Sequence, residues 1–170
     1  MKKKVIFLMI SCAVLWGCGY HLRGTGSFLP SHIKRVSIPL FKNYTTRFEL
    51  DLKLTQSVID EFIARGKVEV TADAKNADAI LVGEILSFNV HPIAFSGQAT
   101  ADTYNIVIAA KIELKDLSND RIIFSNPSFV HQEEYKVPQG TDFEALETEA
   151  LDKVAVKFAR TLVITILEGF

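Results

Sequence analysis

The sequence predicts an α+β fold, a two-layer sandwich in which two helices pack on one face of a four-stranded mixed sheet. Two segments repeat apolar residues at helical spacing, over 46–66 and from 141 almost to 170. Four further segments have the length and apolar content of strands, at 36–41, 79–90, 104–115 and 121–135. The order strand, helix, three strands, helix places all six in a single domain over 36–170.

Composition is that of an ordinary globular chain. Of 170 residues, 48% are hydrophobic and 23% charged, which excludes a disordered, collagen-like or coiled-coil protein. The net charge of −1 argues against a nucleic-acid partner, because such proteins usually carry a basic excess. Two cysteines are too few for a disulfide scaffold or a four-cysteine zinc site.

The N-terminal segment predicts export. Lys2, Lys3 and Lys4 precede an almost unbroken apolar run from Val5 to Trp16. A membrane-spanning helix needs about 20 apolar residues, so this shorter run is typical of a signal peptide, over residues 1–17.

The end of that run contains Leu15-Trp16-Gly17-Cys18, which resembles a bacterial lipobox. This pattern predicts cleavage before Cys18, acylation of its thiol, and a lipidated tether over residues 18–35. Gly19, rather than aspartate, resembles the pattern for delivery to the outer membrane. The alternative is an ordinary secretory signal that happens to contain a cysteine.

The first strand, 36–41, contains Pro39, which favours a sheet edge or a strand end. For the first helix, Thr46 and Glu49 form a capping box and Gly66 stands where a C-terminal glycine belongs. The residues expected on its core-facing stripe are Phe48, Leu52, Thr55, Ile59, Phe62 and Ile63.

The next three strands differ in pattern. Residues 79–90 are nearly continuously apolar, as expected of a strand buried on much of both faces. Residues 104–115 alternate, and the side predicted to face the core carries Ile106, Ile108, Ala110, Ile112 and Leu114. Residues 121–135 contain Pro127, which predicts an edge strand or a bulge.

The second helix begins with another capping box, Thr141 and Glu144. Its predicted core-facing stripe consists of Phe143, Leu146, Ala150, Leu151, Val154, Phe158, Leu162 and Ile166.

The order of elements predicts a parallel strand–helix–strand crossover followed by an antiparallel meander. Both helices should then cover the same sheet face. The other face is half apolar, and the pattern leaves open whether solvent or a partner covers it.

No catalytic or metal-binding pattern is visible. The sequence has no Ser-His-Asp order, glycine-rich phosphate loop or metal-ligand spacing, and it implies no cofactor. The four histidines are isolated from one another, and Glu133 and Glu134 should point to opposite faces of a strand. We therefore expect a protein that is not an enzyme.

The expected topology gathers one candidate site. Two helix N-termini and the loops around 41–47, 96–103 and 135–141 should meet at one pole, with Lys42, Arg47 and Lys136 among them. Helix N-termini and cations suit a phosphate or another anion. The alternative is that these are solvated loop charges.

The run Cys18-Gly19-Tyr20-His21-Leu22-Arg23, placed at a lipobox, resembles the start of the mature LPS-assembly lipoprotein, the LptE family. The element order and the segment from Phe95-Ser96-Gly97-Gln98 to Tyr104 are also similar to that family. The resemblance implies an outer-membrane lipoprotein that plugs a large β-barrel, the LptD translocon, in a one-to-one complex. It implies a role in assembling the barrel and passing lipopolysaccharide to the outer leaflet, with Lys136 the better match to a basic position of the family.

Two functions remain open from the sequence. The first is the barrel partner and lipopolysaccharide-transport component, lipid-anchored in the outer membrane. The second is a free, periplasm-facing lipoprotein that binds a small lipid or peptidoglycan fragment without a barrel.

Overall fold

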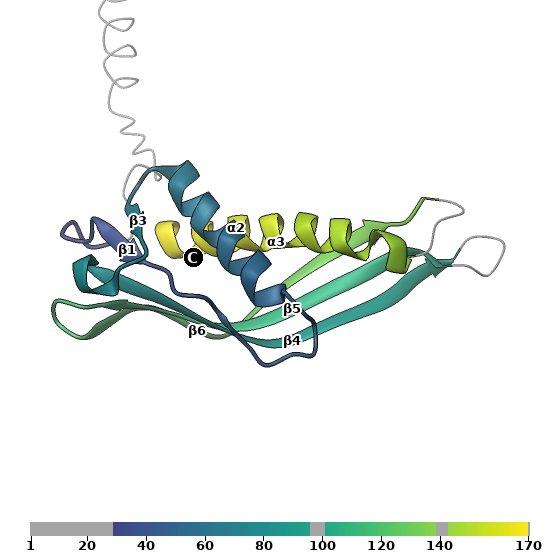
Figure 1. The fold of residues 1–170 in the computed structure, drawn as a ribbon, viewed down its shortest axis with the longest axis horizontal. Coiled ribbons are helices and arrows are strands. Elements are labelled where there is room, and N and C mark those ends of the chain that lie inside the picture. The colour runs from purple at the N-terminus through teal and green to yellow at the C-terminus, as the bar shows by residue number, and fades with distance from the viewer. Residues whose placement is uncertain (1–28, 96–100, 139–142, 170) are drawn as a thin grey trace, which may run out of the picture.

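The computed structural model describes residues 29–95, 101–138 and 143–169 (Figure 1). Its helices and strands form two layers, with both helices above one face of a mixed sheet. The sheet has six strands: β1 (Arg35–Ser37), β2 (Lys42–Asn43), β3 (Glu69–Thr71), β4 (Ala79–Phe95), β5 (Ala101–Asp116) and β6 (Arg121–Lys136). The helices are α2 (Leu50–Arg65) and α3 (Phe143–Glu168), with a 3-10 turn at Ala74–Asn76.

The sheet order is β3-β1-β4-β5-β6. β2 pairs with β4 on the same side as β1, a few residues further along β4. β1 runs parallel to β3 and β4, and β2 runs parallel to β4. The long strands β4, β5 and β6 form an antiparallel meander. The α+β class, the parallel crossover and the meander are therefore confirmed.

The predicted number of four strands is wrong. The strand expected at 36–41 ends at Ser37 as β1, before Pro39, which has no N–H to donate, and β2 follows separately at Lys42–Asn43. The N–H of Phe41 donates instead to Oγ1 of Thr55 in α2, at 2.9 Å. The other additional strand, β3, has only three residues and is too short to show a periodic pattern.

The features predicted for β5 and β6 are confirmed, whereas the prediction that β4 is buried on much of both faces is wrong, because its buried residues, Ala79, Leu81, Gly83 and Ile85, alternate along one face. The alternating core residues of β5, from Ile106 to Leu114, are buried. β6 lies at the sheet edge, and its register shifts between the pairs Ala110–Phe129 and Ile112–Asn126, so the strand carries a bulge around Pro127.

For α2, the predicted C-terminal end is confirmed, and the predicted start is not. Gly66 ends α2 at a φ of 60°, with its N–H bonded to the carbonyls of Phe62 and Ile63, as expected. The predicted capping box is wrong, because α2 begins at Leu50 and Glu49 precedes it in the left-handed region, at a φ of 57°, without a side-chain cap. The buried stripe is correspondingly different: Leu50, Leu54, Thr55, Val58 and Phe62.

For α3, the described members of the predicted stripe, from Ala150 to Ile166, are all buried. Thr141 of the second capping box lies outside the described residues. The core also includes Leu29 and Ile33, which the sequence assigned to the tether, so the last part of that segment packs with the domain.

Candidate functional site

Lys42 lies on β2, a two-residue strand that pairs with β4. Its partner across the strands is Glu84 of β4, and its Nζ is 3.7 Å from Oε1 of Glu84. Lys111 of β5 approaches the other carboxylate oxygen of Glu84 at 3.6 Å. Lys42 is therefore part of a charged group of three on the sheet face opposite the helices.

Arg47 lies in the connection between β2 and α2. The side chain of Asn43 organises this connection, because its Oδ1 accepts from the N–H of Thr45 at 2.9 Å and its Nδ2 donates to the carbonyl of Arg47 at 2.8 Å. Arg47 is half-buried. Lys42 and Arg47 are thus placed by the same short loop.

Lys136 lies far from both. It pairs with Thr103, which pairs in turn with Ala94, ten residues along β4 from Glu84. At about 3.3 Å per strand residue, the separation is about 30 Å. The expectation that the three cations meet at one pole is wrong.

The helix N-termini show why. Figure 1 shows α2 starting near the middle of the sheet and α3 starting at the end where β4 and β5 are joined. β4 extends five residues past the predicted end of the strand, which carries that join away from the start of α2. We call this end of the meander the distal end and the opposite end, where β5 meets β6, the proximal end. Residues 96–100 and 139–142 of the expected pole lie outside the described residues.

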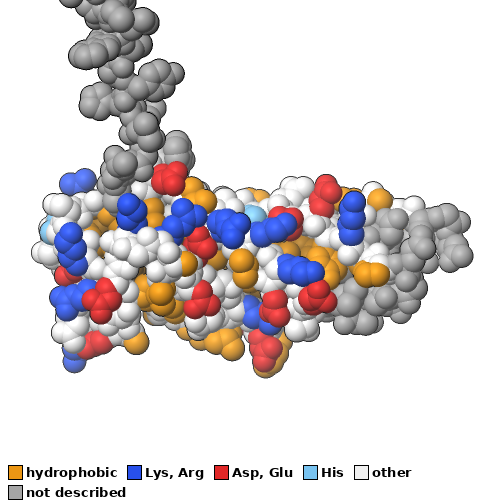
Figure 2. All heavy atoms as spheres, turned by 90° about the horizontal axis from the view of Figure 1, so that it is seen from above, with side chains coloured by type: hydrophobic (Ala, Val, Ile, Leu, Met, Phe, Trp, Pro, Cys, Tyr) orange, Lys and Arg blue, Asp and Glu red, His pale blue; other side chains and the backbone are white. Residues whose placement is uncertain are grey.

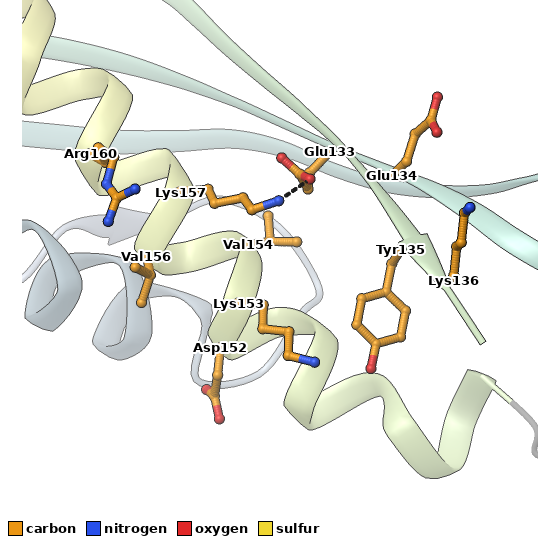
Figure 3. A pocket seen from close by; sticks show the side chains of 10 residues that line it. All are labelled: Glu133, Glu134, Tyr135, Lys136, Asp152, Lys153, Val154, Val156, Lys157 and Arg160. Carbon is orange, nitrogen blue, oxygen red and sulfur yellow. Dashed lines mark hydrogen bonds and ion pairs between the residues drawn. The ribbon is translucent and has the colours of Figure 1, made fainter. Parts of the chain in front are cut away.

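A cleft of about 860 Å³ lies between α3 and the last residues of β6, and we call it the α3–β6 cleft (Figure 3). Its lining residues are Glu133, Glu134, Tyr135, Lys136, Asp152, Lys153, Val154, Val156, Lys157 and Arg160.

Ion pairs organise the walls of this cleft. Lys157 bonds to Glu133 across it, and Lys53 of α2 bonds to Asp152. Lys153 lies with its Nζ 5.5 Å from the centre of the Tyr135 ring and 2.7 Å from Oε1 of Glu149. The bond to Glu149 raises the pKa of Lys153. Arg160 makes no ion pair within the described chain.

Seen from the helical side, basic side chains form a row over the helices, and acidic and hydrophobic side chains lie among them (Figure 2). Sequence reasoning missed Lys153, Lys157 and Arg160 as possible site residues. The available signal was their spacing, because residues 153 and 157 are four apart and 160 is three further on, which places them on one side of a helix.

His131 lies on β6, two residues before Glu133 of the α3–β6 cleft. Its ring is buried against Phe158 of α3, edge to face with centroids 6.1 Å apart, and its Nε2 has no hydrogen-bond partner among the described residues. The nearest carboxylate oxygen, Oε2 of Glu133, is 4.0 Å away. Burial lowers the pKa of His131, which favours the neutral ring.

At the proximal end, two aspartates hold the chain where it enters the domain. Oδ2 of Asp78 accepts from the N–H groups of Lys34 and Arg35 at 2.9 and 2.8 Å, and these bonds lower the pKa of Asp78. The buried Asp116 accepts from the hydroxyl and N–H of Ser118 and lies 2.7 Å from Nε2 of His32. The bonds from Ser118, with a smaller effect of His32, lower the pKa of Asp116 to about 2.

Across the residues that the structure describes, no group of three or more His, Cys, Asp or Glu side chains could hold a metal ion. Within the same ranges, no helix is both long and apolar enough to cross a membrane. Cys18 and the whole expected signal peptide lie outside the described residues.

Comparison with known proteins gives a family and a fold. A family model named LptE and described as "Lipopolysaccharide-assembly" matches residues 33–166. A search of curated protein sequences finds no match.

Several solved structures are similar. PelC from Paraburkholderia phytofirmans, solved as a dodecamer, has a TM-score of 0.51 at 18% identity, covering 84% of this chain and 95% of that one. The hypothetical protein CT253 from Chlamydia trachomatis has a TM-score of 0.56 at 10% identity, covering 81% and 97%. Protein XCC0632 from Xanthomonas campestris has a TM-score of 0.51 at 13% identity, covering 80% and 85%. At these identities the similarities show the fold alone.

Proposed function

The chain belongs to the LptE lipopolysaccharide-assembly family, and we propose that it is an outer-membrane lipoprotein that partners an LptD-type β-barrel one to one. In this role it assists assembly of the barrel and delivery of lipopolysaccharide to the outer leaflet, without catalysis. The observation that carries the proposal is the family match over 33–166, which begins before β1 and reaches the last turn of α3. The family is one of non-enzymatic lipoproteins.

The membrane anchor of this proposal is Cys18. Removal of residues 1–17 would free the cysteine for acylation, and two or more acyl chains hold a protein stably on a membrane. Replacement by Cys18→Ala should release the chain from the membrane fraction and remove the acylated N-terminal peptide from its mass spectrum. A variant that stays membrane-bound would contradict the anchor.

Contact with lipopolysaccharide is proposed for the three cations, with Lys136 in the leading position. Lys136 is exposed, and among the described residues it has no ion-pair partner, so it can meet a phosphate without first leaving a carboxylate. Lys42 would first have to separate from Glu84. Surface ion pairs are worth about 1 kcal/mol or less, so this cost is small but lowers the ranking of Lys42. Arg47 lies in the connection that follows β2.

Binding of purified lipopolysaccharide can be tested separately at Lys136 and at the pair Lys42 and Arg47. We expect Lys136→Glu to weaken binding about tenfold, because it replaces an attraction with a repulsion, and Lys42→Glu with Arg47→Glu to weaken it less. Lys67→Glu with Lys75→Glu is the control, since both lysines are exposed and neither is ion-paired within the described chain. Equal affinity in all variants would remove these residues from the site while leaving the barrel partnership untouched.

The partnership itself is tested by purifying the native, tagged protein from membranes in mild detergent. An outer-membrane barrel present at about the same molar amount is the expected result, read by mass spectrometry. A monomer that repeatedly comes without a barrel would favour the second function, a free lipoprotein that binds a small lipid or peptidoglycan fragment.

A further inference from the structure

The outer edge of β6 is open along the described chain. β6 has 16 residues and pairs with β5 alone, since it ends the strand order of the sheet. The N–H of Ser128 donates to Oδ1 of Asn126, and from Phe129 to Glu134 no backbone hydrogen bond reaches a described residue other than the β5 partners. An edge of this kind presents a row of unpaired N–H and C=O groups that another strand can pair with.

The bulge divides this edge into two unequal parts. Pro127 and the register shift beside it interrupt pairing in the proximal part. The remaining run, Ser128–Lys136, has nine residues without proline or glycine, and its register with β5 is unbroken from Phe129 onward. It is long enough to pair with a typical strand of five or six residues.

The α3–β6 cleft lies beside the distal end of that run. Its strand side is formed by residues 133–136, and its helix side by α3 between Asp152 and Arg160 (Figure 3). Val154 and Val156 supply apolar lining, and Lys153, Lys157 and Arg160 supply positive charge. A strand added to β6 would direct alternate side chains towards this cleft, because successive side chains of a strand point to opposite faces.

We propose that the outer edge of β6 over Ser128–Lys136 accepts an extended, acidic segment of the barrel partner as an added strand, with alternate side chains in the α3–β6 cleft. This inference rests on the proposed function, because it names the surface through which the partner binds. Main-chain hydrogen bonds along β6 supply affinity, and the exposed Arg160, with Lys153 and Lys157 on the same side of α3, selects acidic side chains.

The charges favour this occupant. Lys157 and Lys153 are already bonded to Glu133 and Glu149, and Asp152 is bonded to Lys53. Arg160 is exposed and makes no ion pair within the described chain. Glu134 points away from α3 in Figure 3, so it does not neutralise the helix side of the cleft. An acidic side chain of the added segment can therefore bind Arg160 without displacing a carboxylate that already pairs with it.

The first experiment compares hydrogen exchange of the free chain and of the purified complex with the barrel. Alternate N–H groups of an edge strand point outward, so about half of the amides in 128–136 should exchange quickly in the free chain and slowly in the complex. Fast exchange of these amides in a complex that does contain the barrel would overturn the inference while leaving the proposed function intact. Failure to recover any barrel would refute both.

The second experiment tests the charge selection. Lys153→Glu with Arg160→Glu should reduce the barrel recovered with the tagged chain about tenfold at equal expression, and raised salt should weaken the wild-type complex in the same direction. The charge-matched control is Lys67→Glu with Lys75→Glu, which should leave recovery unchanged. Circular dichroism of both double variants establishes that they are folded. Equal recovery from a folded Lys153/Arg160 variant would refute the selection of an acidic segment.

Discussion

The two helices lie on the same sheet face, yet they are held there differently. α3 is buried over a broad side that includes Leu151, Phe158 and Leu162, and it packs against both β6 and α2. α2 buries a narrower stripe and leaves Leu52 and Ile63 57% and 59% exposed. The difference teaches that apolar spacing identifies a helix, whereas its first residue and its neighbours decide which side is buried.

The largest expected effect is at the centre of α3. Phe158 is fully buried and meets Phe129 of β6 edge to face, with ring centroids 5.3 Å apart. Phe158→Ala should lower the free energy of unfolding by about 3–5 kcal/mol, because it removes this contact and leaves a cavity. Urea denaturation measures the change, and a loss below about 1 kcal/mol would mean that α3 is not the more strongly held helix.

A smaller effect is expected where α2 meets the sheet through Phe41. A Cβ on Gly83 of β4 would lie 2.6 Å from the buried Phe41 ring. Gly83→Ala should therefore cost about 1–3 kcal/mol of stability. Adding Phe41→Leu should recover part of that loss in a double-mutant cycle, whereas additive losses would show that the ring is not what the new methyl group meets.

The pH dependence of stability tests the packing of α3, because His131 is buried against Phe158 of this helix. Burial lowers the pKa of His131 below its ordinary 6.5, so the unfolded chain binds this proton more readily than the folded chain. The stability that this neutral ring contributes is present above pH 6.5 and is lost as the pH falls from there towards the lowered pKa. Denaturation midpoints at pH 7.5 and about 5.5 should differ less in His131→Gln than in wild type. His91→Gln, at an exposed position, should keep the wild-type difference.

The smallest effect is expected on the exposed side of α2. Leu52→Ser removes an apolar side chain that is mostly in solvent, so the free energy of unfolding should change by no more than about 0.5 kcal/mol. A loss above about 1 kcal/mol would show that this side of α2 is packed in solution and that the contrast between the helices is weaker than the structure implies.

Most of the fold could be predicted from patterns that the chain repeats over many residues. The alternation from Ile106 to Leu114, the apolar run from residue 79 and the edge position required by Pro127 all correspond to observed strands. The misses concern short or irregular elements. β3 has three residues, and the entry to α2 depends on a left-handed Glu49 that a capping-box pattern does not indicate.

The site was less predictable because it depends on how far the strands extend. Lys42 and Lys136 would lie close together if β4 ended at residue 90, but the strand continues to Phe95. The cations of the α3–β6 cleft lie on the polar side of α3, where charged residues are common whether or not they bind anything. Only the placement of β6 beside that side distinguishes Lys153, Lys157 and Arg160 from ordinary surface charges.

The three long strands also determine the length of the domain. β4 has 17 residues and spans up to about 55 Å when extended, with the His32–Asp116 contact near its proximal end and the join to β5 at its distal end. A bilayer with its headgroups is about 40–45 Å thick. A domain held at its proximal end on one surface of a membrane therefore has enough length to present its distal end near the other surface, so the two ends can work in different surroundings.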